Sequence, residues 1–256
     1  MATFNRDIRL EERNDTLKRR THVECMQLNL QHSRAATYNL TQTMIQKNID
    51  VAFLQELYAI RNKVAEFPKS FKIFAYGNGR KRSAIILNKN NIDAVAIKQA
   101  SDEDATLIEI CYKGLNFYGT SLYFAIDRDI ERDTGKVKEI KELTRAKALI
   151  LSIDSNSRSK LWHDMYTNQW GKTLEEFIIT SDLLLMNEAT GIPTFETIRG
   201  RIWIDLTLCN NILAQNTKKW SCREEESCSD HKLMLFNTEA GTPACNVFNH
   251  AGHVIQ

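Results

Sequence analysis

Short apolar runs alternate with polar turns along most of the chain, and nearly all of these runs have the length and composition of β-strands. They are rich in Val, Ile, Leu, Phe and Tyr and are separated by turn-forming or charged residues. The predicted strands cover residues 23–30, 51–54, 71–76, 84–87, 94–97, 106–112, 115–124, 148–153, 183–186, 202–209 and 233–236. So many short strands in succession predict extended, mostly antiparallel sheet.

Three segments have the periodicity of helices instead. Residues 34–46 follow Ser33, which is a favoured N-cap residue. Residues 134–147 carry apolar side chains at the spacing of an amphipathic helix, and residues 174–179 indicate a third helix. We therefore predict an α/β fold, a four-layer sandwich in which two mostly antiparallel sheets pack face to face with helices outside.

The composition fits one large folded domain. A chain of 256 residues with 43% hydrophobic content can bury a substantial core. We place this domain at residues 22–238, after a charged, disordered leader over 1–21 and before a linker or tail over 239–256. Because 34 basic residues nearly balance 32 acidic ones, any binding to nucleic acid must rely on a local patch.

Apolar runs of membrane-spanning length, about 18 residues, are absent from the sequence, and the N-terminus lacks the apolar core of a secretory signal. We expect an intracellular protein without a membrane partner. The six cysteines are scattered and form no C-x-x-C motif, which predicts reduced thiols. A zinc site built from Cys222, Cys228 and His231 is disfavoured by its irregular spacing and by the lack of a fourth ligand.

Carboxylate and amide side chains stand at the ends of several predicted strands, as metal-assisted phosphodiester hydrolysis requires. That reaction needs a cation, an activated water and donors for the charge that develops. Glu56 follows the apolar run 51–55 and is the leading ligand candidate, because Mg²⁺ takes one or two protein carboxylates. We expect Mg²⁺ as the cofactor, with Mn²⁺ as an alternative. A solvated acid at a strand end is the simpler interpretation of Glu56 taken alone.

Asp154 and Asn156 lie two positions apart, so an extended backbone would turn both side chains to the same side. An acid that orients water and an amide that donates to a phosphate oxygen would then share one pocket. The competing interpretation is a polar turn after the strand, since Asp, Ser and Asn favour local hydrogen bonds.

His231 is a candidate proton acceptor, because an unperturbed imidazole titrates at about 6.5. Asp205 is the candidate carboxylate that orients this imidazole. Asp230 should point to the opposite side of an extended backbone, which suits the metal or its waters. Whether His231 or Asp154 acts as the general base stays open at this point.

In this order, the motifs resemble those of the exonuclease, endonuclease and phosphatase superfamily, which includes the apurinic/apyrimidinic endonucleases. The resemblance runs from about residue 23 to residue 236 and implies the same fold and a shared site. The matching positions are the first asparagine (Asn29), the metal-binding glutamate (Glu56), the phosphate-facing tyrosine (Tyr123), the aspartate-x-asparagine pair (Asp154 and Asn156), the histidine-orienting acid (Asp205) and the terminal pair (Asp230 and His231).

Two positions depart from the family pattern. The family often has Gly before the first aspartate and Phe after it, where this chain has Ile153 and Ser155. Repair-type members carry an acid two residues after the first asparagine, where this chain has Gln31. Because of these departures, we expect metal binding to depend mainly on Glu56. They also argue against repair-like activity at abasic sites.

Segments 191–195 and 200–205, together with Ser157, Leu161 and Trp162, resemble the endonuclease domains of non-LTR retrotransposons with defined insertion targets. Telomeric-repeat-associated insect elements are the most similar group. The resemblance implies a domain that acts in the nucleus and nicks double-stranded DNA. The 3′-hydroxyl at the nick would prime a reverse transcriptase domain of the same polyprotein.

Basic side chains occur in two places suited to contacts with DNA. They are Arg80, Lys81 and Arg82 in a short loop, and Arg199 and Arg201 around Gly200 in a predicted hairpin. In related nucleases the loop matching the first group approaches the phosphate backbone, although a solvated basic turn is an alternative. Two other functions compete with a nuclease. One is a phosphatase or phosphodiesterase acting on a lipid or inositide, and the other is a non-catalytic DNA-binding module.

Overall fold

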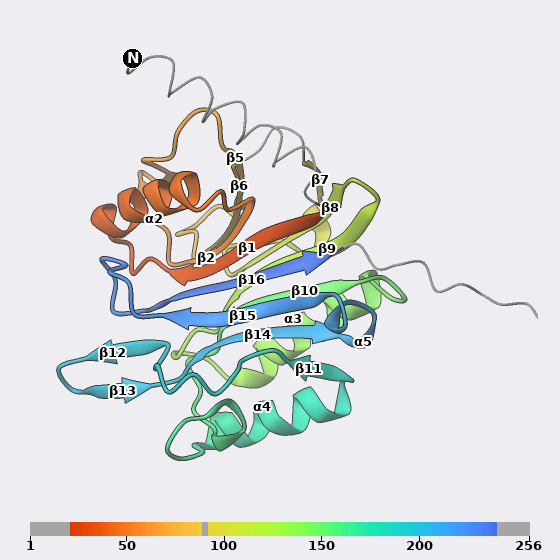
Figure 1. Ribbon diagram of the computed structural model, residues 1–256. Helices are drawn as coiled ribbons and strands as arrows, with labels where there is room; N and C mark the ends of the chain where they lie inside the picture. Colours follow the sequence, from red (N-terminus) through yellow and green to blue (C-terminus); the bar gives the residue numbers. More distant parts are fainter. Residues whose placement is uncertain (1–20, 89–91, 240–256) are drawn as a thin grey trace, which may run out of the picture.

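Two six-stranded sheets pack face to face in the computed structural model, which describes residues 21–88 and 92–239 (Figure 1). The first sheet contains β1 (His22–Asn29), β2 (Val51–Gln55), β5 (Lys72–Phe74), β6 (Ser83–Leu87), β15 (Thr217–Arg223) and β16 (Leu233–Glu239). The second contains β7 (Asp93–Ala96), β8 (Ala105–Tyr112), β9 (Leu115–Tyr123), β10 (Leu149–Asp154), β11 (Leu183–Leu185) and β14 (Asp205–Asn210). All but the ends of the predicted leader and tail lie outside the described residues.

Helices cover the outer faces of both sheets. Helix α2 (Arg34–Gln46) packs on the first sheet, and α3 (Ile130–Leu143) and α4 (Gln169–Thr180) pack on the second (Figure 1). The smaller elements are β3 (Ala59–Ile60), β4 (Lys63–Val64), β12 (Phe195–Thr197), β13 (Gly200–Ile202), α5 (Asn211–Ala214) and the 3₁₀ turns η1 (Lys98–Ala100) and η2 (Lys160–Trp162). The predicted four-layer α/β sandwich is confirmed.

The two sheets share one pairing pattern. Their orders are β15-β16-β1-β2-β6-β5 and β11-β14-β10-β9-β8-β7. In each sheet only the central pair is parallel, β1 with β2 and β9 with β10, and the other pairs are antiparallel. Helices α2 and α3 connect the parallel strands, whose carboxyl ends therefore lie at the same edge of each sheet.

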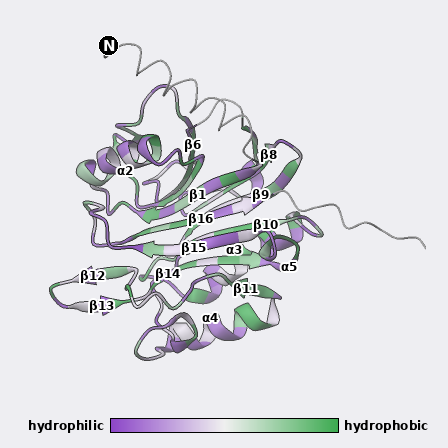
Figure 2. Ribbon diagram, viewed as in Figure 1, coloured by the Kyte–Doolittle hydropathy of each residue, from purple (hydrophilic) through white to green (hydrophobic). Residues whose placement is uncertain are grey.

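Three apolar clusters hold the layers together. One fills the space between the sheets, one lies beneath α2 and one lies beneath α3 and α4. Both the strands and the helices carry hydrophobic and hydrophilic residues (Figure 2). Between the sheets Phe53 stacks on Phe236 with ring centroids 6.1 Å apart. A Cβ atom at Gly119 would lie 2.8 Å from the Phe53 ring, so glycine permits this close approach.

The predicted elements agree with the observed ones except at particular boundaries. Helix α2 has the predicted bounds, and the Ser33 hydroxyl accepts a hydrogen bond from the Ala36 N–H at 3.1 Å. Helix α3 begins four residues before its predicted start. The predicted strand 202–209 divides into β13 and β14.

Strand β15 was not predicted, because its charged residues conceal its alternation. Lys218 and Lys219 are exposed, whereas Trp220 and Cys222 are buried in the core between the sheets. Lysines on an edge strand discourage pairing with another chain, which explains this composition at the end of the sheet. Within residues 21–88 and 92–239, no helix has the length and apolar character needed to cross a membrane.

Candidate active site

The facing sides of the two sheets change from apolar to polar toward the carboxyl ends of the central strands. On β1 the inward row begins with Val23 and Cys25 and ends with Gln27 and Asn29. The Gln27 amide crosses to the second sheet and donates to the Ile153 carbonyl at 3.1 Å. These buried amides connect the two sheets directly beneath the candidate site.

Strand register alone brings three candidate residues together. Asp154, at the end of β10, is the register partner of Tyr123 on β9 and of Asp205 on β14. Residues directly opposite each other on neighbouring strands project from the same face of a sheet. The second sheet therefore presents a phenol and two carboxylates in one row.

The Asn29 amide connects this row to the first sheet. Its Nδ2 atom donates to Asp154 Oδ2 at 2.7 Å and to Glu56 Oε2 at 3.2 Å, and Asn29 is fully buried. One side-chain nitrogen thus bridges two carboxylates that come from different sheets. The candidate metal ligand and the candidate water-orienting acid are neighbours.

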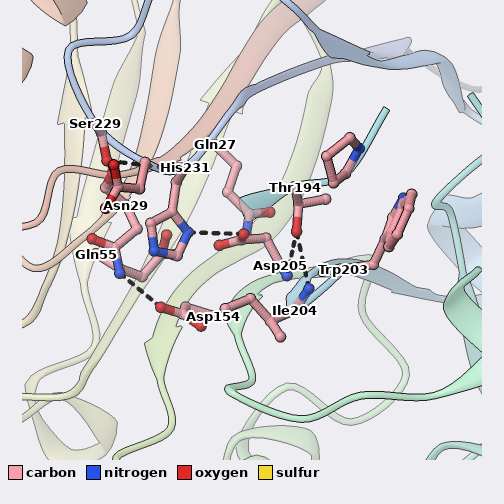
Figure 3. A network of polar contacts seen from close by, with 12 residues as sticks. Gln27, Asn29, Gln55, Asp154, Thr194, Trp203, Ile204, Asp205, Ser229 and His231 are labelled. Carbon is pink, nitrogen blue, oxygen red and sulfur yellow. Dashed lines mark hydrogen bonds and ion pairs between the residues drawn. The ribbon is translucent and has the colours of Figure 1, made fainter. Parts of the chain in front are cut away.

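His231 and Asp205 form a buried ion pair, with Nδ1 of the imidazole 2.9 Å from Oδ2 of the carboxylate (Figure 3). The Thr194 hydroxyl fixes the Asp205 segment, because it accepts from the backbone N–H groups of Ile204 and Asp205 at 2.9 and 3.0 Å. The Phe195 ring packs edge-to-face with the imidazole, with ring centroids 4.7 Å apart. Since Nδ1 is occupied, Nε2 is the nitrogen left for the reaction.

The expectation that Asp154 and Asn156 share one side of an extended strand is wrong. Asn156 has φ +48°, and its N–H donates to Asp154 Oδ1 at 3.2 Å, as in a polar turn. The turn nevertheless directs the Asn156 side chain to the Tyr123 hydroxyl, and its Nδ2 donates to the Phe124 carbonyl at 2.9 Å. Glu56 also has a positive φ, +46°, so both site residues lie in strained turns at strand ends.

The sequence is similar to a known protein family and to proteins of retrotransposable elements. Residues 117–235 match the model of the Exo_endo_phos_2 family, described as endonuclease-reverse transcriptase. The chain is 27% identical over 190 residues to the retrovirus-related Pol polyprotein from the type-1 retrotransposable element R1 of Bradysia coprophila, covering 68% of the chain and 18% of the relative. It is 20% identical over 226 residues to the putative 115 kDa protein in the element R1DM of Drosophila melanogaster, covering 85% and 22%. The chain thus spans about a fifth of these relatives.

Solved structures agree in fold. The endonuclease domain of TRAS1, a telomere-specific non-LTR retrotransposon, superposes with a TM-score of 0.79 at 24% identity, over 86% of this chain and 99% of that one. The AP endonuclease LMAP from Leishmania major has a TM-score of 0.70 at 11% identity, covering 86% and 88%. The chain therefore has the fold of these endonucleases, and residues 117–235 resemble the endonuclease-reverse transcriptase family.

Two ionisable side chains of the candidate site are held in single protonation states. Burial would raise the pKa of Glu56, but hydrogen bonds and charge from His32 and the Asn29 amide lower it, so the carboxylate is ionised and ready to bind a cation. Burial, together with the carboxylates of Glu56 and Asp154, raises the pKa of Tyr123. Its hydroxyl therefore stays protonated and able to donate to a phosphate oxygen.

Asp154 and His231 have pKa values displaced toward and beyond neutrality. Burial and the negative charge of Asp205 raise the pKa of Asp154 to about 7. Burial would lower the pKa of His231, but attraction to Asp205 and the hydrogen bond between them raise it to about 9. At neutral pH the imidazole carries a proton, and Asp154 is poised to exchange one.

In a chelating buffer, the free energy of unfolding should fall by roughly 3 kcal/mol as the pH rises from about 6.5 to about 9. The folded state holds the His231 proton more tightly than the unfolded chain does. This stabilisation is complete below the unfolded pKa and is lost as the pH rises through the folded pKa. Urea unfolding across this window measures the fall, and His231→Gln should flatten it. Equal slopes for both proteins would contradict the assignment.

The donor set fits a hard divalent cation. Asp154, Asp205 and His231 place one ligand atom each within 4.8 Å of one another, and Glu56 is joined to Asp154 through Asn29. Asp205 Oδ1 is buried and has no hydrogen-bond partner among the described residues. Three carboxylates around a single imidazole leave an excess of negative charge, and carboxylate oxygens are the ligands that Mg²⁺ and Mn²⁺ prefer.

Asp230 lies apart from this cluster. His231 is buried and Asp230 is exposed, so the two side chains point to different sides as predicted, although Asp230 lies in a bend before β16 and not in a strand. Its carboxylate accepts from Gln31 Nε2 at 3.1 Å, and its N–H donates to Gln31 Oε1 at 2.8 Å. Among the described contacts none joins Asp230 to Glu56, the other predicted metal ligand.

Sequence reasoning missed three residues that support the site. The Gln31 side chain donates a hydrogen bond to the Asp230 carboxylate, and the Thr194 hydroxyl accepts one from the Asp205 N–H. His32 lies with Nε2 3.2 Å from Glu56 Oε1, and its Nδ1 is 2.8 Å from the Leu57 carbonyl. Their partners are distant in sequence or come from loops, so no periodic pattern marks them.

The predicted DNA-contacting residues lie in two different settings. Arg199 and Arg201 belong to the β12–β13 hairpin, which extends from the body of the domain (Figure 1). Arg201 pairs there with Glu196 at 3.2 Å. In the other group, Lys81 donates to two backbone carbonyls, Arg82 is held by Asp104, and Arg80 is exposed.

Proposed function

We propose that this endonuclease domain nicks double-stranded target DNA by phosphodiester hydrolysis that depends on Mg²⁺, with Mn²⁺ as a substitute. The observation that carries the proposal is the Asn29 bridge between Glu56 and Asp154, beside the buried pair of Asp205 and His231. It gathers an ionised metal ligand, an acid titrating near neutrality and an imidazolium in one place.

Each polar group has a distinct role in this proposal. Glu56 would hold the cation directly and Asp230 would contact its waters, and the bound cation would neutralise charge on the phosphate. Tyr123 and Asn156 donate to oxygens of the scissile phosphate, and Asn29 keeps the two carboxylates in place.

Of the two candidates, Asp154 and His231, Asp154 is the one that would act as the general base. Its pKa of about 7 lets it accept a proton from the attacking water near neutral pH. As the water oxygen bonds to phosphorus, the bond from phosphorus to the 3′ oxygen would break, and that oxygen would take a proton from solvent. His231, with a pKa of about 9, stays protonated and stabilises the negative charge that develops on the phosphate. Asp205 fixes the imidazole ring and balances its charge, since both side chains are buried.

The relatives support a proposal for the cellular role. The similar R1 protein is a Pol polyprotein, and the similar TRAS1 domain belongs to a telomere-specific element. We infer that this domain is part of a longer polyprotein with a reverse transcriptase and acts in the nucleus. Its nick would leave a 3′-hydroxyl that primes reverse transcription, preferentially at telomeric repeats.

Incubation with supercoiled plasmid tests the activity. The domain should convert it to the relaxed form with Mg²⁺ or Mn²⁺ and leave it supercoiled with a chelator. A DNA polymerase should extend the nicked strand, because extension requires a 3′-hydroxyl. Release of phosphate from an inositide without nicking would identify a phosphatase, and DNA binding without cleavage would identify an inert module.

Mapping the nicks tests the target. Duplexes containing telomeric repeats should be cut at a repeated position, whereas scrambled duplexes of equal composition should not. Uniform cutting of both would refute the telomeric preference and leave the nuclease activity standing.

A further inference from the structure

A cleft of about 710 Å³ opens beside the site, and Glu56 and Tyr123 stand among its walls. The loop before β6 forms one wall and the segment leading into α3 forms another. Four arginines line the cleft, two from each wall, namely Arg80, Arg82, Arg128 and Arg132. This arrangement suits a polyanion that continues beyond the scissile phosphate.

Asp104 ties the two walls together. Its carboxylate accepts from Arg82 Nε at 2.6 Å and Nη2 at 2.7 Å, and from Arg128 Nη1 at 2.6 Å. Arg128 also donates from Nε to Asp133 at 3.0 Å. The side chains of Asp104 and Arg128 are only 14% and 18% exposed, so these charge-assisted bonds are well sheltered.

The same turn fixes the basic loop through Glu103. Glu103 Oε1 accepts from the backbone N–H groups of Asn78 at 2.7 Å and Gly79 at 2.9 Å. Gly77 has φ +87°, and a Cβ there would lie 2.3 Å from the Glu103 carboxyl carbon. The loop therefore takes one conformation against the acidic turn.

Charge pairing divides the four arginines into two classes. Arg82 and Arg128 are balanced by Asp104 and Asp133, and Arg82 stacks on the Tyr123 ring at 5.0 Å. Arg80 and Arg132 are exposed and form no ion pair with another described residue. The two available guanidinium groups thus stand on opposite walls.

We propose that this cleft binds the DNA strand next to the scissile phosphate, with Arg80 and Arg132 contacting flanking phosphates. The acidic turn formed by Asp102, Glu103 and Asp104 positions both walls, and through Arg82 it positions Tyr123. This proposal rests on the proposed nuclease function. It assigns a substrate-binding role to Arg132, and it makes Asp104 a positioning residue.

Salt-dependent binding tests the contacts. Affinity for a labelled duplex is measured in chelator over a range of salt for Arg80→Ala, Arg132→Ala and the wild type. Each substitution should reduce the slope of log affinity against log salt by about 1, because one phosphate contact is lost. Arg145→Ala is the matched control. It is exposed beyond the far end of α3, roughly 20 Å from Arg132, and should leave the slope unchanged.

The outcomes separate this proposal from the nuclease assignment. Unchanged slopes for Arg80→Ala and Arg132→Ala, with a wild type that nicks plasmid, would overturn the cleft and leave the nuclease standing. A wild type that neither binds nor nicks DNA would overturn both.

Asp104→Asn tests the positioning role. Removing this charge makes the cleft more positive, so DNA affinity should not weaken. The kcat for nicking should nevertheless fall about tenfold, because Arg82 and Tyr123 lose their anchor. Circular dichroism and thermal unfolding confirm the fold, and Asp104→Glu should recover part of kcat. Weaker DNA binding, or an unchanged kcat in folded Asp104→Asn, would overturn the role of Asp104.

Discussion

Replacement of His231 with Gln should reduce DNA nicking by roughly 10²- to 10⁴-fold while leaving DNA affinity nearly unchanged. The imidazole is 3% exposed, pairs with Asp205 at 2.9 Å and is protonated at neutral pH. A glutamine can donate a hydrogen bond but carries no charge. The loss should therefore appear in kcat, because the charge on the phosphate develops mainly in the transition state.

Single-turnover nicking of supercoiled plasmid measures this effect. His163→Asn is the matched control, because His163 is exposed and has φ +73°, which asparagine tolerates. His231→Ala is less suitable, since it leaves Asp205 buried without its partner and should cost roughly 3 kcal/mol or more of stability. Near-wild-type nicking by a folded His231→Gln protein would remove His231 from the mechanism.

The strands and one helix could be read from the sequence because their signals are local. Short runs rich in apolar residues mark strands such as β2 and β9, and Ser33 marks the start of α2. Strand β15 escaped because two successive lysines interrupt the alternation on an edge strand. The repeated pairing pattern of the two sheets was also hidden, since it is a property of topology and not of residue spacing.

The members of the candidate site could be predicted from the order of the motifs, but their contacts could not. The Asn29 bridge to Asp154 joins residues 125 positions apart and exists only because two sheets pack face to face. Asp230 stays a predicted contact to the metal or its waters, and its bond to Gln31, 199 positions away, could not be read from the sequence. Such pairings depend on loop conformation, for which the sequence carries no periodic signal.

Replacement of Asp154 with Asn should lower nicking by roughly 10³-fold, because an amide cannot accept the proton of the attacking water. Its effect on the free energy of unfolding should depend on pH, whereas a simple loss of contacts would lower stability equally at every pH. The wild-type carboxylate has a folded pKa of about 7 against an ordinary value of 3.8, so its ionisation costs stability as the pH rises through this interval. The variant escapes that cost.

Urea unfolding in chelator should therefore show the stability of Asp154→Asn gaining on the wild type between about pH 4 and pH 7. Loss of one hydrogen bond, from Asn29 or from the Asn156 N–H, offsets the gain by a constant amount of roughly 1 kcal/mol. Asp182→Asn, an exposed acid just before β11, should change neither quantity. A pH-independent difference would show that Asp154 is an ordinary acid. If Asp154→Asn loses nicking activity while its stability rises relative to the wild type, the Asp154 carboxylate is retained for catalysis although it destabilises the fold.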